Sequence, residues 1–363
     1  MNRFSGKLAL QQRVLPTYRA PFFDLLASAC DGGMSLFTGL PRPSEGIATT
    51  DTLQVAKYTL GKNIHVLSGS YYLCYQQGLI PWLEETDPDA LIMEANPRYL
   101  SSPAAAEWMH KRDRPVIGWG LGAPPVNGGL RERRRSDFLS QFDAMIAYSY
   151  RGANEYADLG FPVDYLFVAH NSVSPSPTWE MPTRPSTFDV RPCILFVGRL
   201  QARKNVDLLL GACAELGTQP RLIIVGDGPE RDSLEELAQE IYPSAEFVGA
   251  KHGAELKPYF TEADLFVLPG TGGLAVQEAM SYGLPVIVAE GDGTQDDLVR
   301  RGNGWLIPPD DFDALVNTMK DALSSVARLR KMGEESHRVV KEEINLEKMV
   351  DVFVRALNVL TAK

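Results

Sequence analysis

The second half of this 363-residue chain contains five short, largely apolar runs. Apolar runs without polar alternation are typical of strands covered on both faces, as in parallel sheets. A segment of helical character follows each run, and this order predicts right-handed βαβ units around one sheet. The predicted strands cover residues 194–198, 222–226, 246–249, 264–268 and 285–289, and the predicted helices cover residues 206–216, 230–239, 255–261, 274–282 and 295–301.

The first half alternates in a similar way, so we expect an α/β chain with two parallel-sheet, Rossmann-like domains. Residues 40–62 carry little periodicity and are expected to form a long loop. Residues 171–192 are rich in Ser, Thr and Pro and indicate a domain boundary. The expected parts are a first domain over residues 1–175, a linker over 176–192, a second domain over 193–342, and a C-terminal helix over 343–363 that packs across both domains.

Composition excludes several classes of protein. The 46 acidic and 36 basic residues give a net charge of −10, which argues against a nucleic-acid partner. No apolar run is long enough for a membrane span, and none near the start resembles a signal peptide. Four cysteines without a Cys-x-x-Cys motif are expected to be free thiols of a cytoplasmic protein, and the five histidines show no metal-ligand spacing.

A glycine-rich turn and one carboxylate follow the fourth predicted strand of the second half. Glycines before a helix leave backbone N–H groups bare at its N-terminus, which suits a phosphate group. Glu278 is the one acid on the short helix that follows, and a charge on an apolar helix is costly unless it is paired or hydrogen-bonded. A nucleotide site is therefore indicated. The turn and the first helical residue are Gly270, Thr271, Gly272, Gly273 and Leu274.

Two cations lie beyond the first predicted strand of the second half. Gly198 leaves room for a ligand, and Arg199 and Lys204 lie on either side of the turn into the next helix. Arginine binds a diphosphate bidentately and lysine binds it as a point charge. The pair alone is explained equally well by a solvated turn at a helix start.

The next two strand ends carry weaker signals. Residues 225–229 read Val-Gly-Asp-Gly-Pro, but Arg231 stands where a dinucleotide fingerprint requires a third glycine. A tight strand-to-helix turn is favoured there, and a dehydrogenase is disfavoured. The loop after Phe247 contains Lys251, and its backbone could meet the edge of a base.

Taken in order, these motifs resemble the donor-binding half of glycosyltransferase family 4. The resemblance is strong over about residues 190–325, where Gly304-Trp-Leu-Ile-Pro-Pro-Asp-Asp continues it. It is looser over residues 1–175, where Pro16-Thr-Tyr-Arg-Ala-Pro-Phe-Phe is similar to the opening of a bacterial subgroup that makes surface polysaccharides or glycolipids. It implies the GT-B architecture, in which two Rossmann-like domains face each other across a cleft.

The resemblance also implies an activity and its participants. A hexose-type sugar would pass from a nucleotide-diphosphate donor to a saccharide or lipid-linked acceptor, with retention of anomeric configuration. No metal ion or other cofactor is expected. The enzyme would be cytoplasmic, with peripheral contact at the inner face of the membrane as a further expectation.

The resemblance also implies roles for individual residues, which are assigned by their position in the family's motifs. Arg199 and Lys204 would hold the donor diphosphate and stabilise its departure. Backbone N–H groups around residues 272–274 would meet the phosphates or the sugar. Glu278 would accept hydrogen bonds from the ribose hydroxyls, and Lys251 would lie near the base.

Two positions depart from the family pattern. A first glutamate that contacts the sugar is expected eight residues before the second, and Gly270 stands there. The first domain often carries a histidine in a loop after a strand, and the corresponding residues 118–124 contain none. A catalytically inactive relative that serves as a binding or partner subunit is therefore the alternative. An epimerase or phosphorylase of similar shape is a further, less favoured one.

The acceptor side gives fewer signals. Arg19 in the first strand-to-helix turn, Glu94 at a strand end, and Trp119 and Gly120 after another strand are the acceptor-side candidates. The basic run over residues 131–135 could meet anionic lipid headgroups, although a solvated helix face is favoured. The base, the sugar, the acceptor and the oligomeric state stay open.

Overall fold

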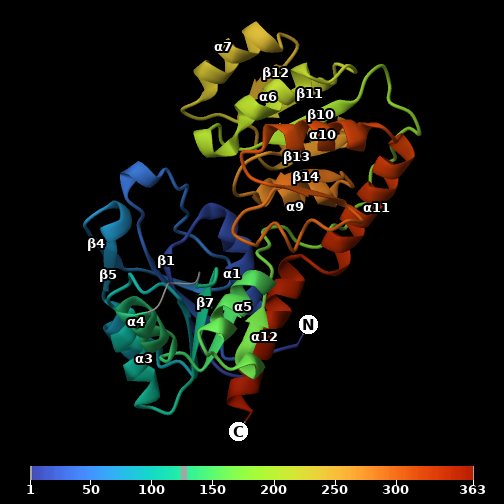
Figure 1. Ribbon diagram of the computed structural model, residues 1–363. Coiled ribbons are helices and arrows are strands. Elements are labelled where there is room, and N and C mark those ends of the chain that lie inside the picture. The colour runs from blue at the N-terminus through green and yellow to red at the C-terminus, as the bar shows by residue number, and fades with distance from the viewer. Residues whose placement is uncertain (1, 124–128, 363) are drawn as a thin grey trace. The chain divides into compact units, whose positions relative to one another are not determined.

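The computed structural model describes residues 2–123 and 129–362, and it describes only the backbone of residues 130–134. The chain divides into two compact units (Figure 1). Met1–Val173 and Leu346–Lys363 form the first domain, and Ser174–Asn345 forms the second. The linker expected over residues 176–192 is thus counted with the second domain.

The first domain contains a parallel sheet with strand order β3-β2-β1-β6-β7-β8-β9. Side chains alternate between its two faces, because Leu8 and Leu10 join the core against α1 and α12 while Ala9 joins the core on the opposite face. Its strands are β1 (Leu8–Val14), β2 (Met34–Gly39), β3 (Lys57–Leu60), β6 (Ala90–Glu94), β7 (Val116–Gly120), β8 (Ala144–Ala147) and β9 (Leu166–Val168). Its helices are α1 (Ala20–Ser28), α2 (Leu79–Thr86), α3 (Ser102–His110), α4 (Leu130–Leu139), α5 (Tyr150–Asp158) and α12 (Leu346–Thr361).

The prediction of a long loop over residues 40–62 is wrong for the last third of that range. Strand β3 lies there and pairs with β2 at the edge of the sheet. An antiparallel hairpin, β4 (Lys62–Val66) and β5 (Leu73–Gln77), follows it. These strands are partly exposed, so they lack the apolar runs that mark the buried strands.

The second domain contains a parallel sheet with strand order β12-β11-β10-β13-β14-β15, the order of a dinucleotide-binding Rossmann domain. The five predicted strands are confirmed. A sixth, β15, extends the sheet, and the helix predicted over residues 295–301 is wrong because turns occupy that segment. The strands are β10 (Cys193–Val197), β11 (Arg221–Val225), β12 (Glu246–Gly249), β13 (Leu265–Leu268), β14 (Val286–Ala289) and β15 (Gly304–Ile307). The helices are α6 (Val206–Ala214), α7 (Arg231–Ile241), α8 (Lys257–Glu262), α9 (Leu274–Ser281), α10 (Phe312–Leu323) and α11 (Val326–Glu342).

Helix α12 returns to the first domain after the second domain is complete. Its Phe353 is fully buried, and the ring centroid lies 5.0 Å from that of Phe22 and 5.0 Å from that of Trp119. The Asn358 side chain donates a hydrogen bond of 3.0 Å to the carbonyl of Arg3. Where the sequence led us to expect a helix across both domains, the structure counts α12 as part of the first domain's core.

Phe353→Ala is expected to destabilise the first domain by about 3–5 kcal/mol, because it removes a large side chain from a packed aromatic cluster. Hydrogen exchange of the intact protein measures this as faster exchange in β7, with β13 unchanged. Val359→Ala, on the exposed side of the same helix, is the matched control and should change neither strand. Equal loss of protection in both sheets would contradict the assignment of α12 to the first domain.

Candidate functional site

The second sheet has a topological switch point between β10 and β13. These strands are parallel neighbours, and the chain leaves them toward opposite faces of the sheet. The loops after them therefore diverge and leave a crevice at the carboxyl ends of the strands, where open α/β sheets bind ligands. The loop after β10 carries Arg199 and Lys204, and the loop after β13 is the glycine turn, residues 270–273.

Lys204 fastens these two loops together. It ends a short 3-10 helix, Ala202–Lys204, and its Nζ donates hydrogen bonds to the carbonyls of Thr271 at 2.6 Å and Gly272 at 2.9 Å. In return the Thr271 backbone N–H donates to the carbonyl of Arg203 at 3.0 Å. Arg203 also donates from Nη1 to the Thr271 carbonyl at 3.2 Å, a contact that the sequence analysis did not anticipate.

The ammonium group of Lys204 is held where an anion would stabilise it. The residue is 7% exposed, and burial, with the charge of Arg203 as a second cause, lowers the pKa of Lys204 to about 8. Two of its three N–H donors are used by carbonyls, which leaves one for a ligand. A bound phosphate group would oppose both causes of the lowered pKa.

Gly270 has a steric reason to be glycine. A Cβ built on it would lie 2.5 Å from the Cα and the carbonyl carbon of Lys204, and closer still to the carbonyl oxygen of Arg203. Real Cβ atoms do not approach backbone so closely, so the loop after β10 occupies the space that a side chain at position 270 would need. The absence of a carboxylate side chain at position 270 therefore leaves no empty space, because the loop after β10 fills it.

Gly270→Ala is expected to destabilise the second domain by about 3 kcal/mol, because the Lys204 loop must shift to admit the methyl group. Thermal unfolding followed by calorimetry measures the effect. Gly217→Ala is the matched control, since a Cβ there meets no atom within 4 Å. A variant as stable as the control would contradict the close approach of the two loops.

Glu278 stands one turn into α9, as expected. It is partly buried, and in the described ranges its carboxylate has no hydrogen-bond or ion-pair partner. Burial raises the pKa of Glu278 to about 7. The site thus holds a carboxylate that is costly to ionise and has its full capacity to accept hydrogen bonds available.

Glu278→Gln is expected to stabilise the second domain at neutral and alkaline pH. The folded pKa lies above the ordinary value of 4.5, so ionisation costs stability as the pH rises from about 4.5 to about 7. The difference between the variant and the wild type should be absent at pH 4.5 and reach about 3 kcal/mol above pH 7.

Unfolding measured by calorimetry from pH 4.5 to 8 tests this stability profile. Glu240→Gln, on the exposed face of α7, is the control and should show no such trend. A wild type that gains stability relative to Glu278→Gln as the pH rises would refute the raised pKa.

A cavity of about 750 Å³ lies beside the switch point, over the carboxyl ends of β10 and β11 and the loop after β12. Gly198, Arg199 and Lys251 line it. Arg199 is exposed, and within the described part of the chain its guanidinium has no hydrogen-bond or ion-pair partner. The cavity therefore presents an unneutralised cation. The turn at 225–229, which we favoured as structural, also lines the cavity.

The acceptor-side candidates of the first domain lie at strand carboxyl ends, but several are used internally. The Trp119 ring is 1% exposed, and a Cβ on Gly120 would lie 2.6 Å from the Tyr156 hydroxyl. Arg19 is buried, with its guanidinium 5.6 Å from the Trp119 ring. It donates to the carbonyl of Ser172 at 3.1 Å and to the side chain of Asn171. Arg19 and Trp119 thus pack against other residues of the first domain in this structure.

Glu94 is likewise engaged at the end of β6. Its carboxylate accepts hydrogen bonds from the Arg13 backbone N–H at 3.0 Å and from the Tyr99 hydroxyl at 2.9 Å. Burial is the main cause that raises the pKa of this carboxyl, and the two hydrogen bonds oppose it. The group is fixed in place at the switch point between β1 and β6.

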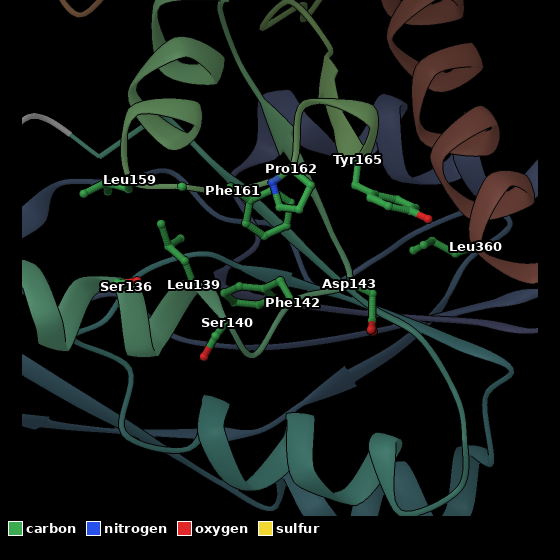
Figure 2. A pocket seen from close by; sticks show the side chains of 11 residues that line it. Ser136, Leu139, Ser140, Phe142, Asp143, Leu159, Phe161, Pro162, Tyr165 and Leu360 are labelled. Carbon is green, nitrogen blue, oxygen red and sulfur yellow. The ribbon is translucent and has the colours of Figure 1, made fainter.

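A separate hollow of about 430 Å³ lies at the amino ends of β8 and β9, the opposite edge of the first sheet (Figure 2). Its wall includes Phe142, Phe161 and Leu360, and it contains none of the predicted site residues. The basic run at 131–135 begins nearby in α4, but the side chains of residues 131–134 lie outside the described ones.

Across 2–123 and 129–362 no three His, Cys, Asp or Glu side chains come together to hold a metal ion. In the same ranges no helix is both long and apolar enough to cross a membrane.

The second domain is similar to known proteins. Residues 179–339 match the family of glycosyl transferases group 1. A GDP-mannose-dependent alpha-mannosyltransferase of Mycobacterium tuberculosis is 36% identical over 160 residues, which are 43% of this chain and 40% of that protein. The chain therefore spans about two fifths of the length of this relative.

Other relatives extend over both domains. A lipopolysaccharide core biosynthesis glycosyltransferase, LpsE of Rhizobium meliloti, is 22% identical over 296 residues, covering 76% of this chain and 87% of that protein. The crystal structure of Anabaena HepE in complex with UDP superposes with a TM-score of 0.71 at 17% identity, covering 99% of this chain and 100% of that one. The chain has the GT-B fold, and residues 179–339 of its second domain match the glycosyl transferases group 1.

Proposed function

We propose that the protein is a glycosyltransferase that moves a sugar from a nucleotide-diphosphate donor to a saccharide or lipid-linked acceptor. The observation that carries the proposal is the contact between Lys204 and the glycine turn at the switch point of the second sheet, with Glu278 one turn into the helix that follows. The cavity lined by Arg199 and Lys251 lies beside them.

The diphosphate would lie between the two loops. Gly272, at φ +77°, places its backbone close to the side chains of Arg203 and Lys204. A Cβ on Gly272 would lie 3.1 Å from Arg203 Nη1 and 3.4 Å from Lys204 Nζ. Bare N–H groups at the start of α9 would complete the cradle. Arg199 would reach the same phosphates from the side of the cavity.

Glu278 would bind the ribose. Its two oxygens accept hydrogen bonds and have none in the described structure, and two neighbouring ribose hydroxyls supply two donors. These hydrogen bonds would favour the ionised carboxylate and oppose the effect of burial on its pKa. The base would then lie in the cavity near Lys251.

The finer features of the reaction are also part of the proposal. The transferred sugar is a hexose and its anomeric configuration is retained. The cations Arg199 and Lys204 stabilise the departing diphosphate, without a resident metal ion or other cofactor, because charge develops on the leaving oxygen as the bond breaks. The protein works in the cytoplasm, with peripheral contact at the membrane where the acceptor is a lipid. The resemblance to an alpha-mannosyltransferase and to a lipopolysaccharide core glycosyltransferase supports this class of donor and acceptor.

No observation favours the alternative of an inactive partner subunit. Its two grounds were the glycine at position 270 and the absence of a histidine from residues 118–124. The approach of the Lys204 loop gives the glycine a structural cause. Arg199, Lys204 and Glu278, the residues proposed to bind the donor, are all present.

Isothermal titration with UDP, GDP and TDP tests the donor site. The wild type should bind at least one of them, and Lys204→Ala and Arg199→Ala should each weaken binding about ten- to a hundredfold, because each removes a charge-assisted hydrogen bond to phosphate. Binding by the wild type should also weaken above pH 8, as Lys204 loses its proton.

Arg301→Ala is the matched control, since Arg301 is exposed and has no hydrogen bond or ion pair in the described structure. Release of the sugar from the nucleotide in a donor screen should persist with a chelator present. The donor site would be refuted if the wild type bound no nucleotide, or if Lys204→Ala left the affinity for the nucleotide unchanged. Loss of turnover on chelation would refute the metal-independent step alone.

A further inference from the structure

The groups assigned so far bind the nucleotide and the diphosphate, and none of them is assigned to the sugar. A side chain at position 270 is excluded by the backbone of the Lys204 loop. Selectivity between donors that share a nucleotide requires polar groups near the glycine turn that read sugar hydroxyls. One such group lies on the carboxyl edge of the sheet.

Gln295 is a buried side chain on this edge whose polar atoms are unsatisfied. It lies in the turns after β14, the strand next to β13, and is 1% exposed. Neither Nε2 nor Oε1 has a hydrogen-bond partner among the residues that the structure describes. Its backbone is fixed, because its carbonyl accepts hydrogen bonds from the N–H groups of Leu298 at 3.0 Å and Val299 at 2.9 Å.

Other buried glutamines of this chain behave differently. Gln277, on α9, donates a hydrogen bond of 2.8 Å to the carbonyl of Ile344. Gln11 and Gln76 bond to each other, and Gln11 also accepts from the Glu94 backbone N–H at 3.1 Å. A buried amide without partners loses its hydration and gains nothing in return, so such groups are rare and call for an explanation.

The carboxamide of Gln295 lies against the glycine turn. A Cβ on Gly273 would lie 3.6 Å from its Nε2, and a Cβ on Gly291 would collide with its Oε1. The side chain thus occupies a space bounded by two glycines, one of which is the N-cap of α9. A sugar diphosphate seated on that turn would bring sugar hydroxyls next to this carboxamide.

We infer that Gln295 recognises the hydroxyl groups of the transferred sugar, a role that rests on the proposed function. A carboxamide donates from nitrogen and accepts at oxygen, and a sugar hydroxyl does both, so one pair of neighbouring hydroxyls satisfies both unpaired atoms. The residue is a determinant of donor selectivity and takes no part in bond breaking. It supplies, from the loop after β14, polar contacts that position 270 cannot supply.

Titration of the intact protein with matched pairs of ligands tests this role. The pairs are UDP with UDP-glucose or UDP-galactose, and GDP with GDP-mannose. Gln295→Met keeps the length of the side chain and removes both polar atoms. It should bind the nucleotide diphosphate as the wild type does and bind the preferred nucleotide sugar about ten- to a hundredfold more weakly.

Gln277→Met is the matched control, since it removes a buried amide from α9 that has its own partner. It should leave the ratio of the two affinities unchanged. Gln295→Glu should restore binding of the preferred sugar in part, because a carboxylate still accepts a hydrogen bond.

The outcomes separate the two proposals. An unchanged ratio in Gln295→Met, with nucleotide binding intact, overturns the role of Gln295 and leaves the proposed function standing. A wild type that binds no nucleotide overturns the proposed function and this inference with it. A Gln295→Met variant that loses the nucleotide and the nucleotide sugar equally shows a structural role and overturns the inference.

Discussion

The hydrogen bonds from Lys204 to the carbonyls of Thr271 and Gly272 organise the second domain's binding edge. A switch point separates the loops on its two sides, and here a buried ammonium group ties them together. The tie is close enough to require glycine at position 270. Burial, with the charge of Arg203 as a second cause, lowers the pKa of Lys204, and a bound anion would oppose that effect. Burial, loop geometry and charge are thus consequences of one contact.

The sequence was sufficient for the buried part of the fold. Strands covered on both faces appear in the sequence as continuous apolar runs, so β10, β11, β13 and β14 were predictable from that pattern alone. The partly exposed strands β3 and β5 were missed because packing on one face leaves no continuous apolar run. The domain to which α12 belongs was not predictable, because an amphipathic pattern shows that a helix has a buried face and says nothing about what covers it.

The sequence also placed Lys204, the glycine turn and Glu278 beyond the carboxyl ends of predicted strands, where open parallel sheets bind ligands. The structure adds that the two strands are neighbours. The sequence could not show that the side chains of Arg19 and Trp119 are buried inside the first domain. An arginine beside aromatic residues gives the same sequence pattern in a core as at a binding surface. Gln295 gave no signal at all. Its buried carboxamide has no hydrogen-bond partner among the described residues, and the lack of a partner can be recognised only when the positions of the surrounding residues are known.

The return of α12 to the first domain has a consequence for synthesis. Phe353 and its neighbours complete a core whose other half is made from the first 173 residues, and the whole second domain is translated between the two. Domains generally fold as units in the order in which they leave the ribosome. The second domain can finish folding while the first still exposes the apolar surface around Phe22 and Trp119. The earlier part of the chain is therefore the last to mature.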